Sequence, residues 1–108
     1  METIKFSTNW NQKLHCNAFT TIRLHNPTKY QKGRTYEIKH KDSLIGYATA
    51  MDVHSFTIDQ LNEWRAYLDT GYSAAETRAV LEKMYKKVDW TTQKLDVILL
   101  LKVKKWRR

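Results

Sequence analysis

A segment of regular alternation at positions 35–41 constrains the fold of this chain more than any other feature. Residues two apart in an extended strand share a face, which places Tyr36, Ile38 and His40 on one side and Thr35, Glu37, Lys39 and Lys41 on the other. A turn at positions 41–43 follows, and residues 44–53 return as the partner strand. Gly46 in this partner predicts a bulge or tight bend. The chain is therefore expected to form an antiparallel hairpin that bends.

Two capping boxes mark the starts of two helices after this hairpin. In Thr57–Gln60 and again in Ser73–Glu76, the first and last side chains can satisfy free amides of a first helical turn. Gly71 lies between the helices as a natural left-handed terminator. The first helix is expected to bury its apolar positions, with Trp64 half-buried: Ile58, Leu61, Trp64 and Leu68. The second carries an apolar stripe typical of core packing: Thr77, Val80, Leu81, Met84 and Tyr85.

The remaining elements complete an α+β domain. Ile4–Phe6 and Thr20–Leu24 are predicted strands, separated by a helical turn at positions 9–15. The final strand starts at Leu95, and its continuously apolar run Val97–Leu101 predicts burial on both faces. The expected fold is a single domain over residues 1–108. It is a mostly antiparallel sheet curled into a small β-barrel, with a helical pair inserted before the last strand.

The chain is strongly basic. Nineteen Lys and Arg residues against eleven Asp and Glu give a formal charge of +8, which favours an anionic partner such as nucleic acid. A surface charge that only aids solubility is the alternative. The candidate phosphate contacts are Lys32, Arg34, Lys102, Lys104, Lys105 and Arg107. No apolar run is long enough to cross a membrane, and the N-terminus does not resemble a signal peptide, so a cytoplasmic protein is expected.

The sequence offers few conventional catalytic or metal-binding motifs. Cys16 is the only cysteine, which excludes an internal disulfide, and the four histidines are scattered. No phosphate-binding glycine loop or metal-ligand spacing is present. No metal and no cofactor are therefore predicted.

A short polar segment, Thr20–Arg23, carries the most specific chemistry. Thr21 and Arg23 share one face of the predicted strand, where a hydroxyl beside a guanidinium could hold a phosphate or a planar polar group. An ordinary strand whose arginine pairs with a carboxylate is the alternative. Asp69, expected on the loop between the helices, could reach a cleft or could simply end a helix.

Four features together resemble the ASCH domain, a branch of the PUA-like superfamily. They are an N-terminal strand and helix leading into Phe19–Arg23, the strand entry Lys32–Ile38, paired helices over 57–85 with an acidic residue between them, and the apolar closing strand. The resemblance spans nearly the whole chain. It implies a barrel with a cleft beside the helices that holds RNA or a nucleotide base.

The resemblance also implies a possible activity. Small bacterial ASCH proteins of similar layout deacetylate N4-acetylcytidine with a lysine, a threonine three residues later and a glutamate between the helices. Thr21 and Arg23 match the family's threonine and arginine. Asp69 lies at the position of the family's glutamate, and Ala18 lies at the position of its lysine. Thr21 therefore lacks the expected activating amine. Lys13 is nearby in sequence, which does not show whether it points into the cleft.

Three hypotheses follow. The first is a PUA-like domain that binds RNA or a modified nucleobase through Thr20, Thr21, Arg23 and Asp69. The second is an amidohydrolase acting on N4-acetylcytidine-like nucleosides, with Thr21 and Asp69 as catalytic residues of a rearranged site. The third is a protein-interaction module with a basic surface.

Overall fold

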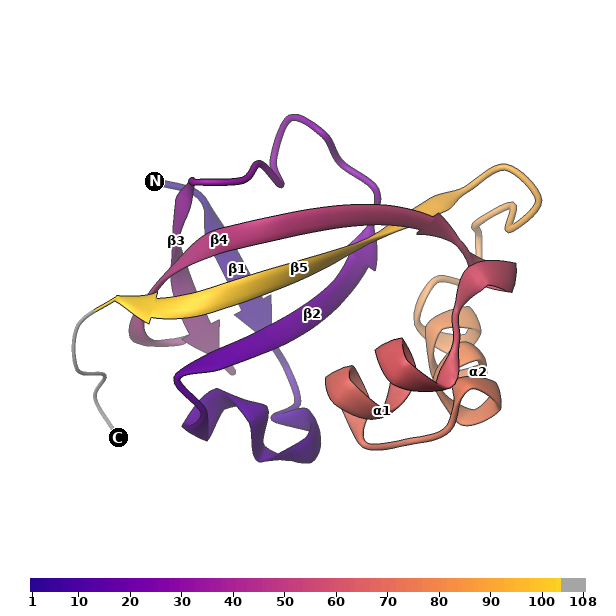
Figure 1. Ribbon diagram of the computed structural model, residues 1–108, viewed down its shortest axis with the longest axis horizontal. Helices are drawn as coiled ribbons and strands as arrows, with labels where there is room; N and C mark the ends of the chain where they lie inside the picture. The colour runs from indigo at the N-terminus through magenta and orange to yellow at the C-terminus, as the bar shows by residue number, and fades with distance from the viewer. Residues whose placement is uncertain (104–108) are drawn as a thin grey trace.

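The computed structural model describes residues 1–103, and it is a mixed α+β fold (Figure 1). Candidate phosphate contacts Lys104, Lys105 and Arg107 lie outside the described residues. The strands are β1 (Thr3–Phe6), β2 (Ala18–Leu24), β3 (Thr35–His40), β4 (Ser43–Thr57) and β5 (Lys94–Val103). Two 3₁₀ helices, η1 (Trp10–His15) and η2 (Ile58–Gln60), and two α-helices, α1 (Glu63–Thr70) and α2 (Ala74–Met84), complete the fold. The predicted insertion of a helical pair before the last strand is confirmed.

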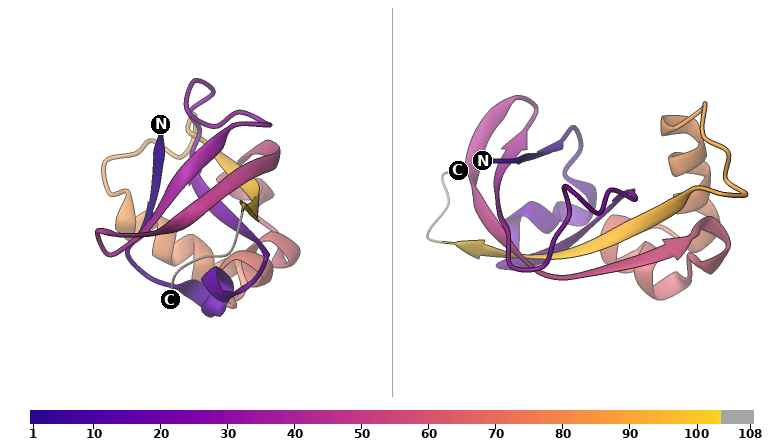
Figure 2. Two further views of the ribbon diagram at one scale, coloured as in Figure 1. Left: turned by 90° about the vertical axis from the view of Figure 1, so that its left-hand side faces the viewer. Right: turned by 90° about the horizontal axis from the view of Figure 1, so that it is seen from above.

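The five strands form one curled sheet in the order β1-β3-β4-β5-β2. Only the β1–β3 pair is parallel, so the prediction of a mostly antiparallel sheet is confirmed. The sheet has the shape of a half-barrel, and its two edge strands, β1 and β2, are not paired with each other (Figure 2). An open seam therefore runs between β1 and β2.

Irregularities in β4 produce the curl. The register shifts where Ile38 faces Gly46 and Lys39 faces Leu44, which leaves one extra residue in β4 and confirms the predicted irregularity at Gly46. A second shift leaves Met51 unpaired between Ala50 and Asp52, opposite β5. Each extra residue increases the local bend and twist of its strand.

Two apolar clusters hold the fold together. The first fills the half-barrel and includes Tyr36 and Ile38, as the alternation of β3 predicts. The second lies between the sheet and the helices and joins Phe56 and Leu95 to Leu81 of α2. The helices cover one end of the sheet only (Figure 1).

One burial prediction is wrong and a second is wrong in part. Residues 97–101 are not buried on both faces, since alternate side chains point to the uncovered side and Leu99 is 41% exposed. Of the predicted apolar positions of the first helix, Ile58 is buried and Leu61 packs against the core, but Trp64 and Leu68 are exposed. The Thr57 capping box opens only η2, α1 starts at the separate cap Asn62, and Trp64 is 78% exposed.

No helix within residues 1–103 is both long and apolar enough to cross a membrane.

Candidate functional site

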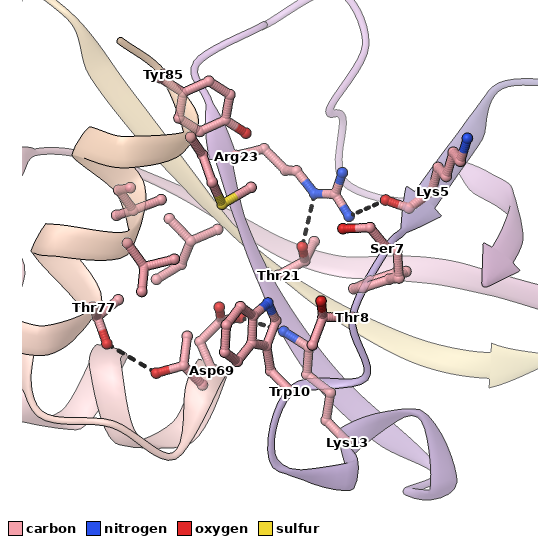
Figure 3. A pocket seen from close by; sticks show the side chains of 16 residues that line it. Lys5, Ser7, Thr8, Trp10, Lys13, Thr21, Arg23, Asp69, Thr77 and Tyr85 are labelled. Atoms are coloured by element: carbon pink, nitrogen blue, oxygen red, sulfur yellow. Dashed lines mark hydrogen bonds and ion pairs between the residues drawn. The ribbon is translucent and has the colours of Figure 1, made fainter. Parts of the chain in front are cut away.

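A cavity of about 330 Å³ lies at the open seam, between the two edge strands and the helices (Figure 3). β1 and the residues after it form one wall, and β2 forms the floor with Thr21, Ile22 and Arg23. η1, α1 and α2 close the remaining sides. This volume falls in the range of small-molecule sites, about 300–1,000 Å³.

A buried ion pair stands at the base of the cavity. Lys13 Nζ of η1 donates a hydrogen bond to Asp69 Oδ1 of α1 over 2.9 Å, and both side chains are almost fully buried. Thr20 Oγ1 donates to the same carboxylate oxygen over 3.0 Å. Neither contact uses Asp69 Oδ2. Together with Thr20, the pair joins α1 to η1 and β2 across 56 and 49 positions of sequence, and both charged residues line the cavity.

Burial shifts the protonation of this lysine. Desolvation lowers the pKa of the Lys13 ammonium below its usual range, and the nearby Arg23 guanidinium lowers it further, while Asp69 partly offsets both effects. A buried ammonium loses its hydration, so its neutral form becomes easier to reach. The site therefore makes the neutral amine of Lys13 easier to reach than that of a solvated lysine.

Thr21 and Arg23 form a second polar pair on the cavity floor. Arg23 Nε donates to Thr21 Oγ1 over 2.9 Å, and its Nη2 donates to the Lys5 carbonyl of β1 over 2.8 Å. Arg23 thus bridges the seam between the edge strands, and the Thr21 hydroxyl keeps its own proton for a ligand. The alternative in which Arg23 pairs with a carboxylate is wrong, because within residues 1–103 it forms no salt bridge.

Both cations lie close to one aromatic ring. Lys13 Nζ lies 5.4 Å from the centroid of the Phe6 ring, and the Arg23 guanidinium carbon lies 4.8 Å from it. Cation–π attraction at such distances favours the charged groups in a partly dry site. Phe6 therefore helps to keep both cations at the cavity.

The apolar stripe of α2 has a different role from the one predicted. All five of its side chains line the cavity. Only Thr77 and Leu81 are buried, and Met84 is 56% exposed. The helical spacing correctly identified one face of α2, but much of that face borders the cavity instead of a packed core.

The structure brings together the four predicted ligand-binding residues, Thr20, Thr21, Arg23 and Asp69, around one ion pair. Thr21, Arg23 and Asp69 line the cavity. Thr20 does not line it, but its hydroxyl donates a hydrogen bond to the Asp69 carboxylate. The prediction that Asp69 lies on a loop is wrong. Asp69 lies in the last turn of α1, where the helix holds its backbone in place.

The predicted phosphate contacts lie elsewhere. Lys32, Arg34 and Lys102 do not line the cavity. Arg34 donates hydrogen bonds to the carbonyls of Thr28 and Lys29, so its guanidinium holds the loop before β3. Lys32 is exposed, and Lys102 is half-buried on β5.

Lys13 is the residue that sequence reasoning did not place. The spacing from Trp10 gives no direction for Lys13, because Gln12 between them has a φ of 54° and interrupts the regular helix. The Trp10 and Lys13 side chains both line the cavity, and the Trp10 ring packs edge-on against Tyr72 at 5.5 Å.

Nothing in residues 1–103 suggests a metal centre, because no three His, Cys, Asp or Glu side chains cluster there. Comparisons with protein-family models, with curated proteins and with solved structures found no match. The function is therefore inferred from the geometry of the cavity.

Proposed function

We propose that this cavity binds a nucleobase or nucleoside, free or as part of RNA. The observation that carries the proposal is the buried Lys13–Asp69 pair, which presents an ammonium and a carboxylate side by side at a base-sized cavity. Isolated buried charges are costly, and a pair that lines a cavity is well placed to exchange hydrogen bonds with a polar ligand.

The polar groups match the edge of a pyrimidine. A cytosine edge offers an amino donor next to ring nitrogen and carbonyl acceptors, and carboxylates accept from such amino groups. Asp69 Oδ2 is the natural acceptor for the amino group. Lys13 and the Thr21 hydroxyl are natural donors to the acceptors of the ring. The resemblance to PUA-like ASCH domains points to the same class of ligand.

A second candidate function is hydrolysis of an acyl amide on such a base. The lowered pKa of Lys13 and its place in the cavity with Thr21 favour this candidate. Lys13 would supply, from η1, the amine that the family has at the position of Ala18. The two side chains lie at the same cavity in Figure 3.

The reaction would take two stages. Thr21 Oγ1 attacks the amide carbonyl carbon while its proton passes to neutral Lys13. The carbon–nitrogen bond then breaks, and Lys13 returns the proton to the leaving nitrogen. Water hydrolyses the resulting acyl ester and frees Thr21 and a carboxylic acid.

Calorimetry and product analysis test both candidates. Cytidine and N4-acetylcytidine should bind to the wild type, and Thr21→Val should weaken binding by about fivefold, the value of one hydrogen bond. If the site is hydrolytic, Thr21→Val and Lys13→Met should each reduce release of acetate by several orders of magnitude. Thr49→Val, a strand threonine that does not line the cavity, is the matched control.

The outcomes separate the candidates. Binding without acetate release would support a binding domain and reject the hydrolase. Tighter binding of short single-stranded RNA than of the nucleoside, with loss of affinity at higher salt, would support an RNA ligand. Failure of every nucleoside and RNA to bind would overturn the proposal and favour the protein-interaction alternative.

A further inference from the structure

The wall of the cavity that α2 forms is mostly apolar. α2 presents Val80, Leu81 and Met84 to the cavity, and Tyr85 at its end extends the same wall. In Figure 3 Tyr85 and the ribbon of α2 lie on the opposite side of the cavity from Lys5 and Ser7. The cavity therefore has two chemically distinct halves.

Part of this apolar wall is not needed to complete the core. Leu81 packs in the cluster under the helices, but Met84 is 56% exposed and Val80 is half-buried at the cavity. A stripe of regular helical spacing normally buries its apolar side chains against protein. Here part of the stripe borders an open volume, so a ligand is the group that can cover it.

A nucleobase edge alone would not use this half. The ring donors and acceptors engage Lys13, Asp69 and Thr21, all of which lie on η1, α1 and β2. A substituent that leaves the polar edge toward α2 meets mostly aliphatic and thioether groups, because the Thr77 hydroxyl is hydrogen-bonded to Thr70 Oγ1 over 2.9 Å. Burial of such a substituent is favourable in proportion to its apolar area.

We infer that the ligand is amphipathic, with a polar amide-bearing edge at the Lys13–Asp69 pair and an apolar substituent larger than acetyl against Val80, Leu81 and Met84 of α2. This inference rests on the proposed function for the identity of the polar edge. The apolar substituent follows from the cavity wall itself.

A series of substituents on a constant base provides the test. Calorimetry would compare N4-acetyl, N4-butanoyl and N4-benzoyl cytidine, with Thr21→Val as the background where turnover occurs. Each buried methylene should tighten binding about fourfold, so butanoyl should bind about 15-fold more tightly than acetyl. Met84→Ser should remove most of this gain.

The matched control is Met51→Ser. Met51 is 45% exposed on β4 and does not line the cavity, so its loss should leave the substituent series unchanged. Both methionines are exposed, and neither replacement is expected to unfold the chain. Equal affinity for all three cytidines would overturn the inference while leaving the proposed function in place.

If none of the three cytidines binds, the proposed function is rejected. A second series of ligands, simple amides without the base, then tests the inference on its own. Acetamide, butanamide and benzamide would be titrated while the methyl NMR signals of Val80, Leu81 and Met84 are followed. Shifts at these methyls that strengthen from acetamide to benzamide would support the amphipathic site. No shift with any of the amides would overturn it.

Discussion

Two buried aspartates, Asp69 and Asp96, show how the same side chain serves different ends in this molecule. Asp96 of β5 accepts hydrogen bonds from His25 Nδ1, from Ser55 Oγ, both over 2.7 Å, and from the backbone amide of Asn26. Both of its oxygens are engaged, and it joins β4, β5 and the chain after β2. Its role is to hold the end of the sheet.

Asp69 has fewer partners and a cavity beside it. Its two partners, Lys13 and Thr20, both use Oδ1, and one of them carries a full charge. Burial alone therefore does not identify a functional carboxylate. A carboxylate engaged on both oxygens is part of the scaffold, whereas one that faces a cavity with a charged partner is available to a ligand.

The largest effect should come from Asp69→Asn. This change leaves the Lys13 ammonium buried without its counter-charge, and loss of one member of a buried pair costs about 3–5 kcal/mol of unfolding free energy. Asp96→Asn should cost less, about 1–3 kcal/mol, because its side-chain partners are a hydroxyl and a partly exposed histidine that can turn to water. Urea denaturation of both variants measures the difference.

A double replacement gives the control for this prediction. Lys13→Met combined with Asp69→Leu removes both charges, and apolar replacement of a buried pair is often neutral for stability. The double variant should recover most of the lost unfolding free energy and still fail to bind a nucleoside. A double variant that stays as unstable as Asp69→Asn would show that the pair is needed for the fold.

The pH dependence of stability should also distinguish the two sites. Burial lowers the pKa of Lys13 in the folded protein, so over the window between that pKa and the usual value of 10.5 the unfolded chain holds a proton that the folded protein has released. The free energy of unfolding should therefore rise with pH across this window. Below the window the lysine is charged in both states and its buried charge costs stability.

Denaturation at a series of alkaline pH values checks the sign. Lys13→Met should remove the rise, whereas Ser55→Ala at the Asp96 site should leave it unchanged. An equal rise in the wild type and in Lys13→Met would mean that another group is responsible.

The smallest effects should come from the hydroxyl partners. Thr20→Val and Ser55→Ala each remove one hydrogen bond to a buried carboxylate, at about 1 kcal/mol of unfolding free energy. Calorimetry should then separate them, because only Thr20→Val disturbs the carboxylate at the cavity and weakens nucleoside binding. Equal ligand affinity in both variants would argue that Thr20 does not position Asp69.

Local patterns predicted most of the elements. The alternation of β3, the turn at Lys41 and Asp42 with φ of 51° and 72°, and the irregularity at Gly46 are all present. The Ser73 capping box opens α2 as expected. These features depend on neighbours in the sequence, through backbone geometry and side chains a few residues away, and so can be read without the fold.

Burial was predicted less well, because it depends on which element covers which face. Trp64 and Leu99 are apolar residues in regular elements, yet both are exposed, because each lies on a face of its element that no other element covers. The α2 stripe shows the same limit, because its spacing identifies a face but not whether protein or a cavity lies against it.

The sequence alone determined that this chain forms a bent antiparallel sheet with a helical pair, and that Thr21 and Arg23 share one face. Only the tertiary structure decided that Lys13, 56 positions away from Asp69, supplies the cation of the site. The reason is physical: a strand or a cap is set by interactions among neighbouring residues. A buried ion pair exists only once η1, β2 and α1 have packed together and excluded water from both charges.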